Sequence, residues 1–191
     1  MAGAISQAAF CLAYAWTARR HGWPAATGAG CVAFALATVA LAGVTPSLAV
    51  LALMVFAALL VAVRAMPRVF EDERVATPPP RWDLPARMVV ATAFVVALTG
   101  AAGTLGPRLT GLLAPFPLYA AILTVFAHAL DGAGPAASVL RGLLVGLVGF
   151  AAFFLVLAAI LSGAGIAVAF AAAIAVALVL QSAALWALRR A

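Results

Sequence analysis

Seven long apolar stretches constrain this chain more than any other feature. They cover residues 2–18, 25–43, 47–66, 87–104, 110–130, 137–161 and 165–187. A helix needs about 20 mostly apolar residues to cross a bilayer. A segment in hydrocarbon must also satisfy its own backbone hydrogen bonds, which a helix does, and the stretches lack the alternation typical of a membrane barrel. We therefore predict an all-α polytopic transmembrane helix bundle with seven spans.

Composition supports a bilayer as the solvent of this chain. Its 191 residues are 68% hydrophobic and 8% charged, whereas soluble domains are about half apolar and about a quarter charged. All 11 basic residues are arginines, grouped in small clusters between apolar stretches. This grouping is typical of membrane flanks and argues against binding to nucleic acid. The first stretch has no positively charged start, so we expect a spanning helix and not a signal peptide.

The arginines also predict an orientation, because cytoplasmic loops are enriched in basic residues. With seven spans, one side of the membrane receives Arg19, Arg20, Arg64, Arg68, Arg74, Arg81, Arg87, Arg141, Arg189 and Arg190. The other side receives Arg108 alone. The interfacial tryptophans fall at the arginine-rich ends of the spans, at Trp16, Trp23, Trp82 and Trp186. We expect the N-terminus outside and the C-terminus in the cytoplasm.

Residues 67–86 form the longest polar segment and divide a three-helix part, residues 1–66, from a four-helix part, residues 87–191. The segment contains three consecutive prolines, which forbid a continuous helix. We expect a cytoplasmic linker, either a docking loop or a solvated connector. Asp83 at its end is a candidate cap for the fourth span.

The stretch around residues 105–122 has an arginine and three prolines between two apolar runs. We expect Arg108 in a short outer turn, either snorkelling to lipid phosphates or attracting an anionic solute. Pro115 and Pro117 predict a kinked or broken fifth span in the outer leaflet. A half-helix starting after Pro117 would direct its positive N-terminal end outward, toward the region below Arg108.

Two ionisable residues, His128 and Asp131, lie three positions apart near the cytoplasmic end of the same span. One interpretation is a gate for protons or substrate. The other is a structural role, in which Asp131 caps the following turn or pairs with Arg141.

Gln181 in the last span suits an interhelical hydrogen bond. The candidate substrate path comprises Arg108, Thr110, Pro115, Phe116, Pro117, Tyr119, His128, Asp131 and Gln181.

Three glycines on one face of the sixth span, Gly142, Gly146 and Gly149, allow another helix to approach closely. This face is either a homodimer seam or a packing surface for another helix of the same chain, for which the seventh span is a plausible partner.

No catalytic or cofactor motif stands out. The sequence has no HExxH, GxSxG or phosphate-binding loop and no Cys/His spacing typical of a metal site. We therefore expect no enzyme activity, no metal and no cofactor. Cys11 and Cys31 lie inside apolar stretches, where packing as small hydrophobic residues competes with a thiol site.

The segments LGPRLTGLLAPFPLYAAILTVFAH and LRGLLVGLVGFAAFFLVLA resemble the corresponding part of uncharacterised bacterial multi-pass membrane proteins of the GlpM-like kind. The resemblance covers roughly residues 87–160. It implies a protein of the bacterial inner membrane, a permease or exporter, with Arg108, Pro115, Phe116 and Pro117 as its distinguishing residues.

Two functions remain open. The first is a small-solute transporter or exporter of the bacterial inner membrane, which requires a polar cavity that reaches Pro115 and Pro117. The second is a non-transporting accessory or scaffold subunit, which predicts a dry bundle with an exposed glycine face. The expected partners are the lipid bilayer, a small anionic solute and a second copy of the chain.

Overall fold

The fold is a bundle of helices, described in a computed structural model for residues 2–44, 46–67, 82–113 and 116–190. Within these ranges the side chains of residues 94, 98, 101–113 and 187–190 are not described. The helices are α1 (Gly3–Ala18), α2 (Trp23–Ala42), α3 (Leu48–Ala65), α4 (Asp83–Leu113), α5 (Leu118–Asp131), α6 (Ala133–Ala164) and α7 (Ile166–Arg190). The described residues contain no strand, so the predicted all-α class is confirmed.

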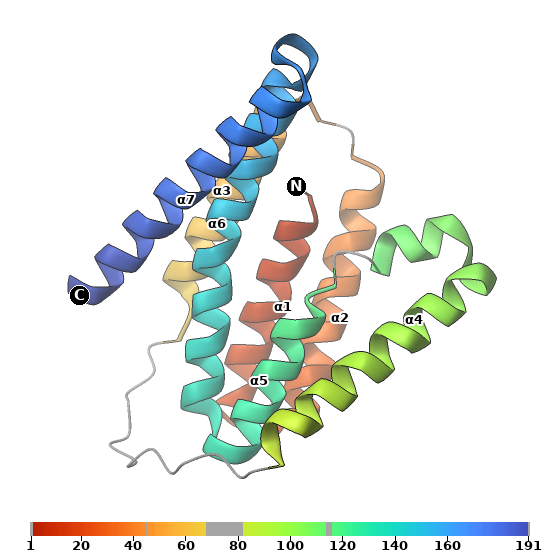
Figure 1. Ribbon diagram of the computed structural model, residues 1–191. Helices are drawn as coiled ribbons and strands as arrows, with labels where there is room; N and C mark the ends of the chain where they lie inside the picture. Colours follow the sequence, from red (N-terminus) through yellow and green to blue (C-terminus); the bar gives the residue numbers. More distant parts are fainter. Residues whose placement is uncertain (1, 45, 68–81, 114–115, 191) are drawn as a thin grey trace.

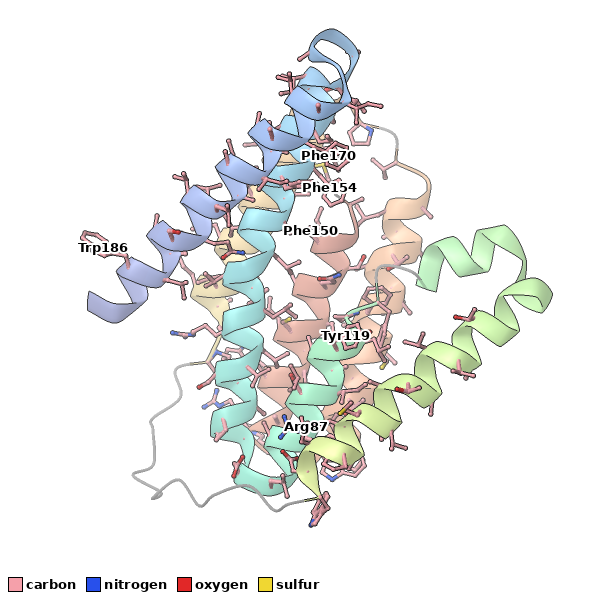
Figure 2. The ribbon with its side chains drawn as sticks, in the orientation of Figure 1. Arg87, Tyr119, Phe150, Phe154, Phe170 and Trp186 are labelled. Carbon is pink, nitrogen blue, oxygen red and sulfur yellow. The ribbon has the colours of Figure 1, made fainter. Side chains whose placement is uncertain are left out.

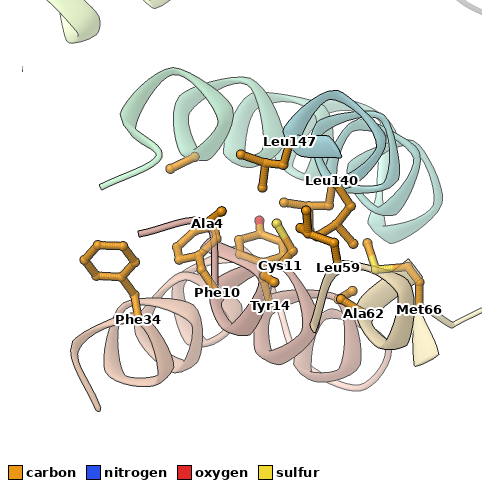
Figure 3. Close-up of a cluster of buried hydrophobic side chains, with 14 of the residues drawn as sticks. Ala4, Phe10, Cys11, Tyr14, Phe34, Leu59, Ala62, Met66, Leu140 and Leu147 are labelled. Atoms are coloured by element: carbon orange, nitrogen blue, oxygen red, sulfur yellow. The ribbon is translucent and has the colours of Figure 1, made fainter. Parts of the chain in front are cut away.

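Helix α1 lies at the centre of the bundle and contacts α2, α3 and α6 (Figure 1). Its buried residues are Ala4, Ser6, Ala8, Phe10, Cys11, Tyr14, Ala15 and Ala18. The many alanines leave room for neighbouring helices on several sides, and in lipid such close packing replaces the hydrophobic effect as the main attraction between helices. The buried side chains from α1, α2, α3 and α6 meet in one apolar cluster (Figure 3).

Helices α1 and α2 approach each other closely where Phe10 lies against Gly30. A Cβ atom placed on Gly30 would be 2.8 Å from Cε2 of Phe10. Phe10 is fully buried, so its ring has little space into which to move. The absence of a side chain at Gly30 is therefore what lets α2 pack against this part of α1.

The outer helices contact few neighbours. Helix α7 packs along α6, and α4 contacts α5. Three phenylalanines near one end of the α6–α7 pair, Phe150, Phe154 and Phe170, are exposed (Figure 2). Apolar surface exposed on so many helices is expected where lipid, and not water, surrounds the bundle.

The boundary between the fourth and fifth predicted spans differs from our expectation. Helix α4 does not end near residue 104 but continues to Leu113, so Arg108 lies within a helix and not in a turn. A helix can continue past a proline when it bends, and the α4 ribbon is visibly bent (Figure 1). The helix interruption predicted at the Pro-Phe-Pro motif is present, because α4 ends at Leu113 and α5 begins at Leu118.

Within the described residues, four helices are long and apolar enough to cross a membrane, judged by length and composition: Trp23–Ala42, Leu48–Ala65, Ala133–Ala164 and Ile166–Trp186. Helix α5 has 14 residues, which corresponds to about 21 Å at the usual rise of 1.5 Å per residue. This length is shorter than the roughly 30 Å of a hydrocarbon core. The fifth predicted span, residues 110–130, is divided by the helix break, and α5 alone is too short to cross the core.

The connections that follow α1 and α5 lie at the same end of the bundle as the start of α4 (Figure 1). The end of α3 belongs there too, because Trp16 near the end of α1 donates a hydrogen bond from Nε1 to the carbonyl oxygen of Ala65, at 3.0 Å. Arg19, Arg20, Arg64 and Arg87 are all near these helix ends. The linker predicted between the two parts falls mostly on residues outside the described ranges.

Replacing Gly30 by Ala should destabilise the bundle, because the new methyl group meets the ring of Phe10. Overpacking of this kind usually costs about 1–3 kcal/mol. Thermal unfolding in detergent measures the loss. The matched control is Gly28→Ala on the same helix, where a Cβ atom meets nothing within 4 Å. Equal melting temperatures for the two variants would contradict the close approach.

Candidate functional site

The most distinctive polar contact inside the bundle joins Tyr14 of α1 to His128 of α5. The Tyr14 hydroxyl lies 3.1 Å from His128 Nδ1. In the tautomer that carries its proton on Nε2, the phenol donates to Nδ1. The two rings also meet edge to face, with centroids 5.9 Å apart. Tyr14 is fully buried and His128 is partly buried.

A third polar side chain lies one helical turn from His128. Thr124 is four residues earlier on α5, so both residues are on one face of the helix. Its side chain is fully buried, and its Oγ1 has no hydrogen-bond partner among the described residues. A buried hydroxyl without a partner carries a free-energy penalty of about 1–3 kcal/mol. We refer to Tyr14, Thr124 and His128 as the Tyr-His site.

Aromatic rings cover the Tyr-His site on the side where α5 begins. Phe116, in the segment before α5, packs edge-on against Phe10 at 5.8 Å and against Phe34 at 5.3 Å between ring centroids. Phe10 in turn lies 6.0 Å from the ring of Tyr14. We call Phe10, Phe34 and Phe116 the Phe cluster. It joins α1 and α2 to the start of α5, with Phe116 held against its neighbours.

The other residues of the predicted path are spread over different surroundings. Pro117 is buried at the start of α5, and Tyr119, two residues later and labelled in Figure 2, is 67% exposed. Arg108 and Thr110 belong to α4, but their side chains lie outside the described part, and Pro115 lies outside it altogether. Of the predicted path residues, His128 therefore belongs to the Tyr-His site. Phe116 is linked to the site indirectly, through the ring of Phe10.

Asp131 is exposed at the end of α5, and the described residues include no ion pair between it and Arg141. The turn after Asp131 is closed by the backbone, with the Gly132 N–H donating to the carbonyl oxygen of His128 at 3.1 Å.

Among the described residues, an ion pair is formed instead by Asp83, in the first turn of α4. Its two carboxylate oxygens each lie 2.9 Å from a nitrogen of Arg87.

Gln181 of α7 contacts the glycine face of α6. Its Nε2 donates a hydrogen bond to the carbonyl oxygen of Gly146 at 3.0 Å. A Cβ atom on Gly149 would lie 2.8 Å from the same nitrogen, whereas one on Gly142 would meet nothing within 4 Å. Two of the three glycines thus pack against a helix of the same chain, and Gly142 remains exposed.

No residues of the described part form a group of three or more His, Cys, Asp or Glu able to hold a metal ion. Cys11 is buried and Cys31 is partly buried, and both are free thiols. The chemistry available at the Tyr-His site is hydrogen bonding, by a phenol, an imidazole and a hydroxyl, in surroundings made mostly of apolar and aromatic side chains.

Two members of the Tyr-His site, Tyr14 and Thr124, were not among the residues predicted from the sequence. The available signal was their polarity within apolar runs, where polar side chains often mark contacts between helices. Many such residues occur along the chain, and no spacing rule relates Tyr14 to His128, 114 positions away. Only the arrangement of the helices brings the two together.

Comparison of the chain with models of protein families, with curated proteins and with solved structures finds no match.

Replacing Tyr14 by Phe should lower stability by about 1 kcal/mol, because His128 Nδ1 loses its partner inside the bundle. The ring and its packing against Phe10 are retained in this variant. Equilibrium unfolding in detergent gives the free-energy difference. Tyr119→Phe is the matched control, since the Tyr119 side chain is exposed. A loss no larger than in the control would show that the hydrogen bond contributes nothing.

Proposed function

We propose that the chain is a multi-pass integral membrane protein that moves a small solute across the bacterial inner membrane, with the Tyr-His site in its path. The observation that carries the proposal is the contact between Tyr14 and His128 beside the unpaired hydroxyl of Thr124. Ionisable residues inside membrane helices are costly, and they commonly line substrate or ion pathways.

The position of the Pro-Phe-Pro break within the proposed membrane supports this function. Asp131, at the end of α5, is a suitable marker of the cytoplasmic interface because it is charged and exposed. From there α5 rises about 21 Å, which brings the Pro-Phe-Pro motif to about two-thirds of the depth of a 30 Å hydrocarbon core. Broken helices at membrane depth are typical of transporters. In this proposal α4 supplies Arg108 on the outer side of the break, where it attracts an anionic solute.

The proposed topology has seven crossings, with the N-terminus outside and the C-terminus in the cytoplasm. Its support is the charge distribution, because Arg19, Arg20, Arg64 and Arg87 lie near helix ends that share one end of the bundle (Figure 1). The positive-inside rule makes that end cytoplasmic. A relationship to the GlpM-like proteins is part of the same proposal and depends on residues 87–160.

A specific observation favours a second candidate, the non-transporting accessory or scaffold subunit. The Phe cluster fills the region beside Pro117 with aromatic packing, which suits a dry and closed bundle. The glycine face gives this candidate less support, because Gly146 and Gly149 already contact Gln181.

Access of water to Thr124 distinguishes the two candidates. The test uses Thr124→Cys in a chain with Cys11→Ala and Cys31→Ala, treated in intact cells with a negatively charged, membrane-impermeant thiosulfonate that matches the charge of the proposed solute. A transporter opens during its cycle, so we expect labelling at a rate well above that of Ala151→Cys, a control position that is fully buried on α6. Equal rates at both positions would favour the accessory subunit and would remove the Tyr-His site from any solute path.

Cysteine labelling also tests the topology. His21→Cys, between α1 and α2, should react only after cells are opened, whereas Val44→Cys, between α2 and α3, should react in intact cells. Both positions are exposed, so burial does not mask the result. The reverse pattern would invert the orientation, and reaction of both positions in intact cells would mean that α2 does not cross the membrane.

A further inference from the structure

A hydrogen bond from one tryptophan side chain joins the end of α1 to the end of α3. Trp16 donates from Nε1 to the carbonyl oxygen of Ala65 at 3.0 Å. Ala65 is the last residue of α3, and its carbonyl has no partner within the helix because the helix ends there. The Trp16 side chain nevertheless remains 51% exposed. The hydrogen bond restrains the orientation of the ring while much of the side chain stays open to the surroundings, as is usual for tryptophan at the level of lipid headgroups.

A guanidinium group lies over this ring. The Cζ atom of Arg19 is 4.9 Å from the centre of the Trp16 ring, within the range of a cation–π contact. Arg19 forms no ion pair among the described residues, so its N–H donors remain available to an acceptor. Those donors match the geometry of phosphate oxygens, which arginine binds in pairs.

A second guanidinium belongs to the same helix junction. Arg64 is exposed and precedes Ala65, the residue that accepts the Trp16 hydrogen bond. Among the described residues, neither Arg19 nor Arg64 forms an ion pair with a carboxylate. Asp83, the nearest acid along the described chain, is already bound to Arg87. The junction therefore presents positive charge that the described part of the protein does not neutralise.

Apolar side chains continue from this junction along α3. Leu60 and Val61, one turn before Arg64, are 53% and 61% exposed. A ligand that places a negative group beside Arg19 and Arg64 would extend an apolar portion along these side chains. Anionic phospholipids have this combination of a phosphate and hydrocarbon chains, and basic groups at the membrane surface attract them.

We propose that Arg19, Arg64 and Trp16 form a binding site for the headgroup phosphate of an anionic phospholipid. We call these three residues the headgroup site. The site holds the α1–α3 junction at the membrane surface, with the two guanidinium groups as hydrogen-bond donors to the headgroup. The inference is independent of transport and holds for an accessory subunit as well.

The first experiment compares lipid nanodiscs of phosphatidylcholine alone with nanodiscs that contain phosphatidylglycerol. We expect a higher melting temperature with phosphatidylglycerol, and we expect native mass spectrometry to detect this lipid bound to protein released from the mixed nanodiscs. Stabilisation of equal size in both lipids would overturn the proposal. In detergent, inorganic phosphate alone should produce no comparable shift, and a comparable shift would mean that the site takes a free anion.

The second experiment separates a defined site from general attraction between charges. Arg19→Gln combined with Arg64→Gln should reduce retention of phosphatidylglycerol several-fold. Arg20→Gln, the matched control, removes a neighbouring exposed charge that is not stacked on Trp16, and it should have little effect. A reduction by Arg20→Gln equal to that by Arg19→Gln alone would show diffuse attraction without a site.

The role of the tryptophan is tested by Trp16→Phe, which keeps an aromatic ring but loses the N–H donor to Ala65. Lipid retention should fall because the ring is no longer held in place. Trp82→Phe is the control, since Trp82 is similarly exposed at 56% and lies at the start of α4. Melting temperatures in lipid-free detergent verify that each variant is folded. Retention unchanged in Trp16→Phe would remove Trp16 from the site.

Discussion

The contact between Phe10 and Gly30 is the constraint on which much of the bundle depends. In lipid, helices attract one another mainly through close packing, and this ring occupies the space that any side chain at position 30 would need. The same ring also touches Phe116 and Tyr14. One side chain thus sets the separation of α1 and α2, the position of the segment before α5 and the surroundings of the tyrosine.

The placement of α5 follows from this packing and explains how a polar contact is formed inside an apolar bundle. Phe116 holds the start of the helix against α1 and α2, and α6 supports its length. This arrangement brings His128 to Tyr14, and Thr124 to the same side of the helix. Toward the other end of α5, a cation–π contact links this helix to α4. The Cζ atom of Arg87 lies 5.2 Å from the centre of the Phe126 ring.

Some elements of the bundle could be predicted from the sequence and others could not, for physical reasons. Proline cannot donate a backbone hydrogen bond, so the interruption before Leu118 was predictable. The continuation of α4 past Pro107 was not, because a proline ends some helices and only bends others. His128 was identified from its ionisable side chain in an apolar span, but its partner depends on how distant helices pack. The amide of Gln181 suited an interhelical hydrogen bond, yet its acceptor, the Gly146 carbonyl, is a backbone atom that sequence does not distinguish from others.

Helices α5 and α6 are joined by a single residue, Gly132, whose φ of 95° is readily adopted only without a side chain. A connection of one residue keeps the end of α5 beside the start of α6, and the two helices pack against each other. The same α6 carries Gly146, whose carbonyl accepts the hydrogen bond from Gln181 of α7. Helix α6 is therefore a shared neighbour of the helix that carries His128 and of α7.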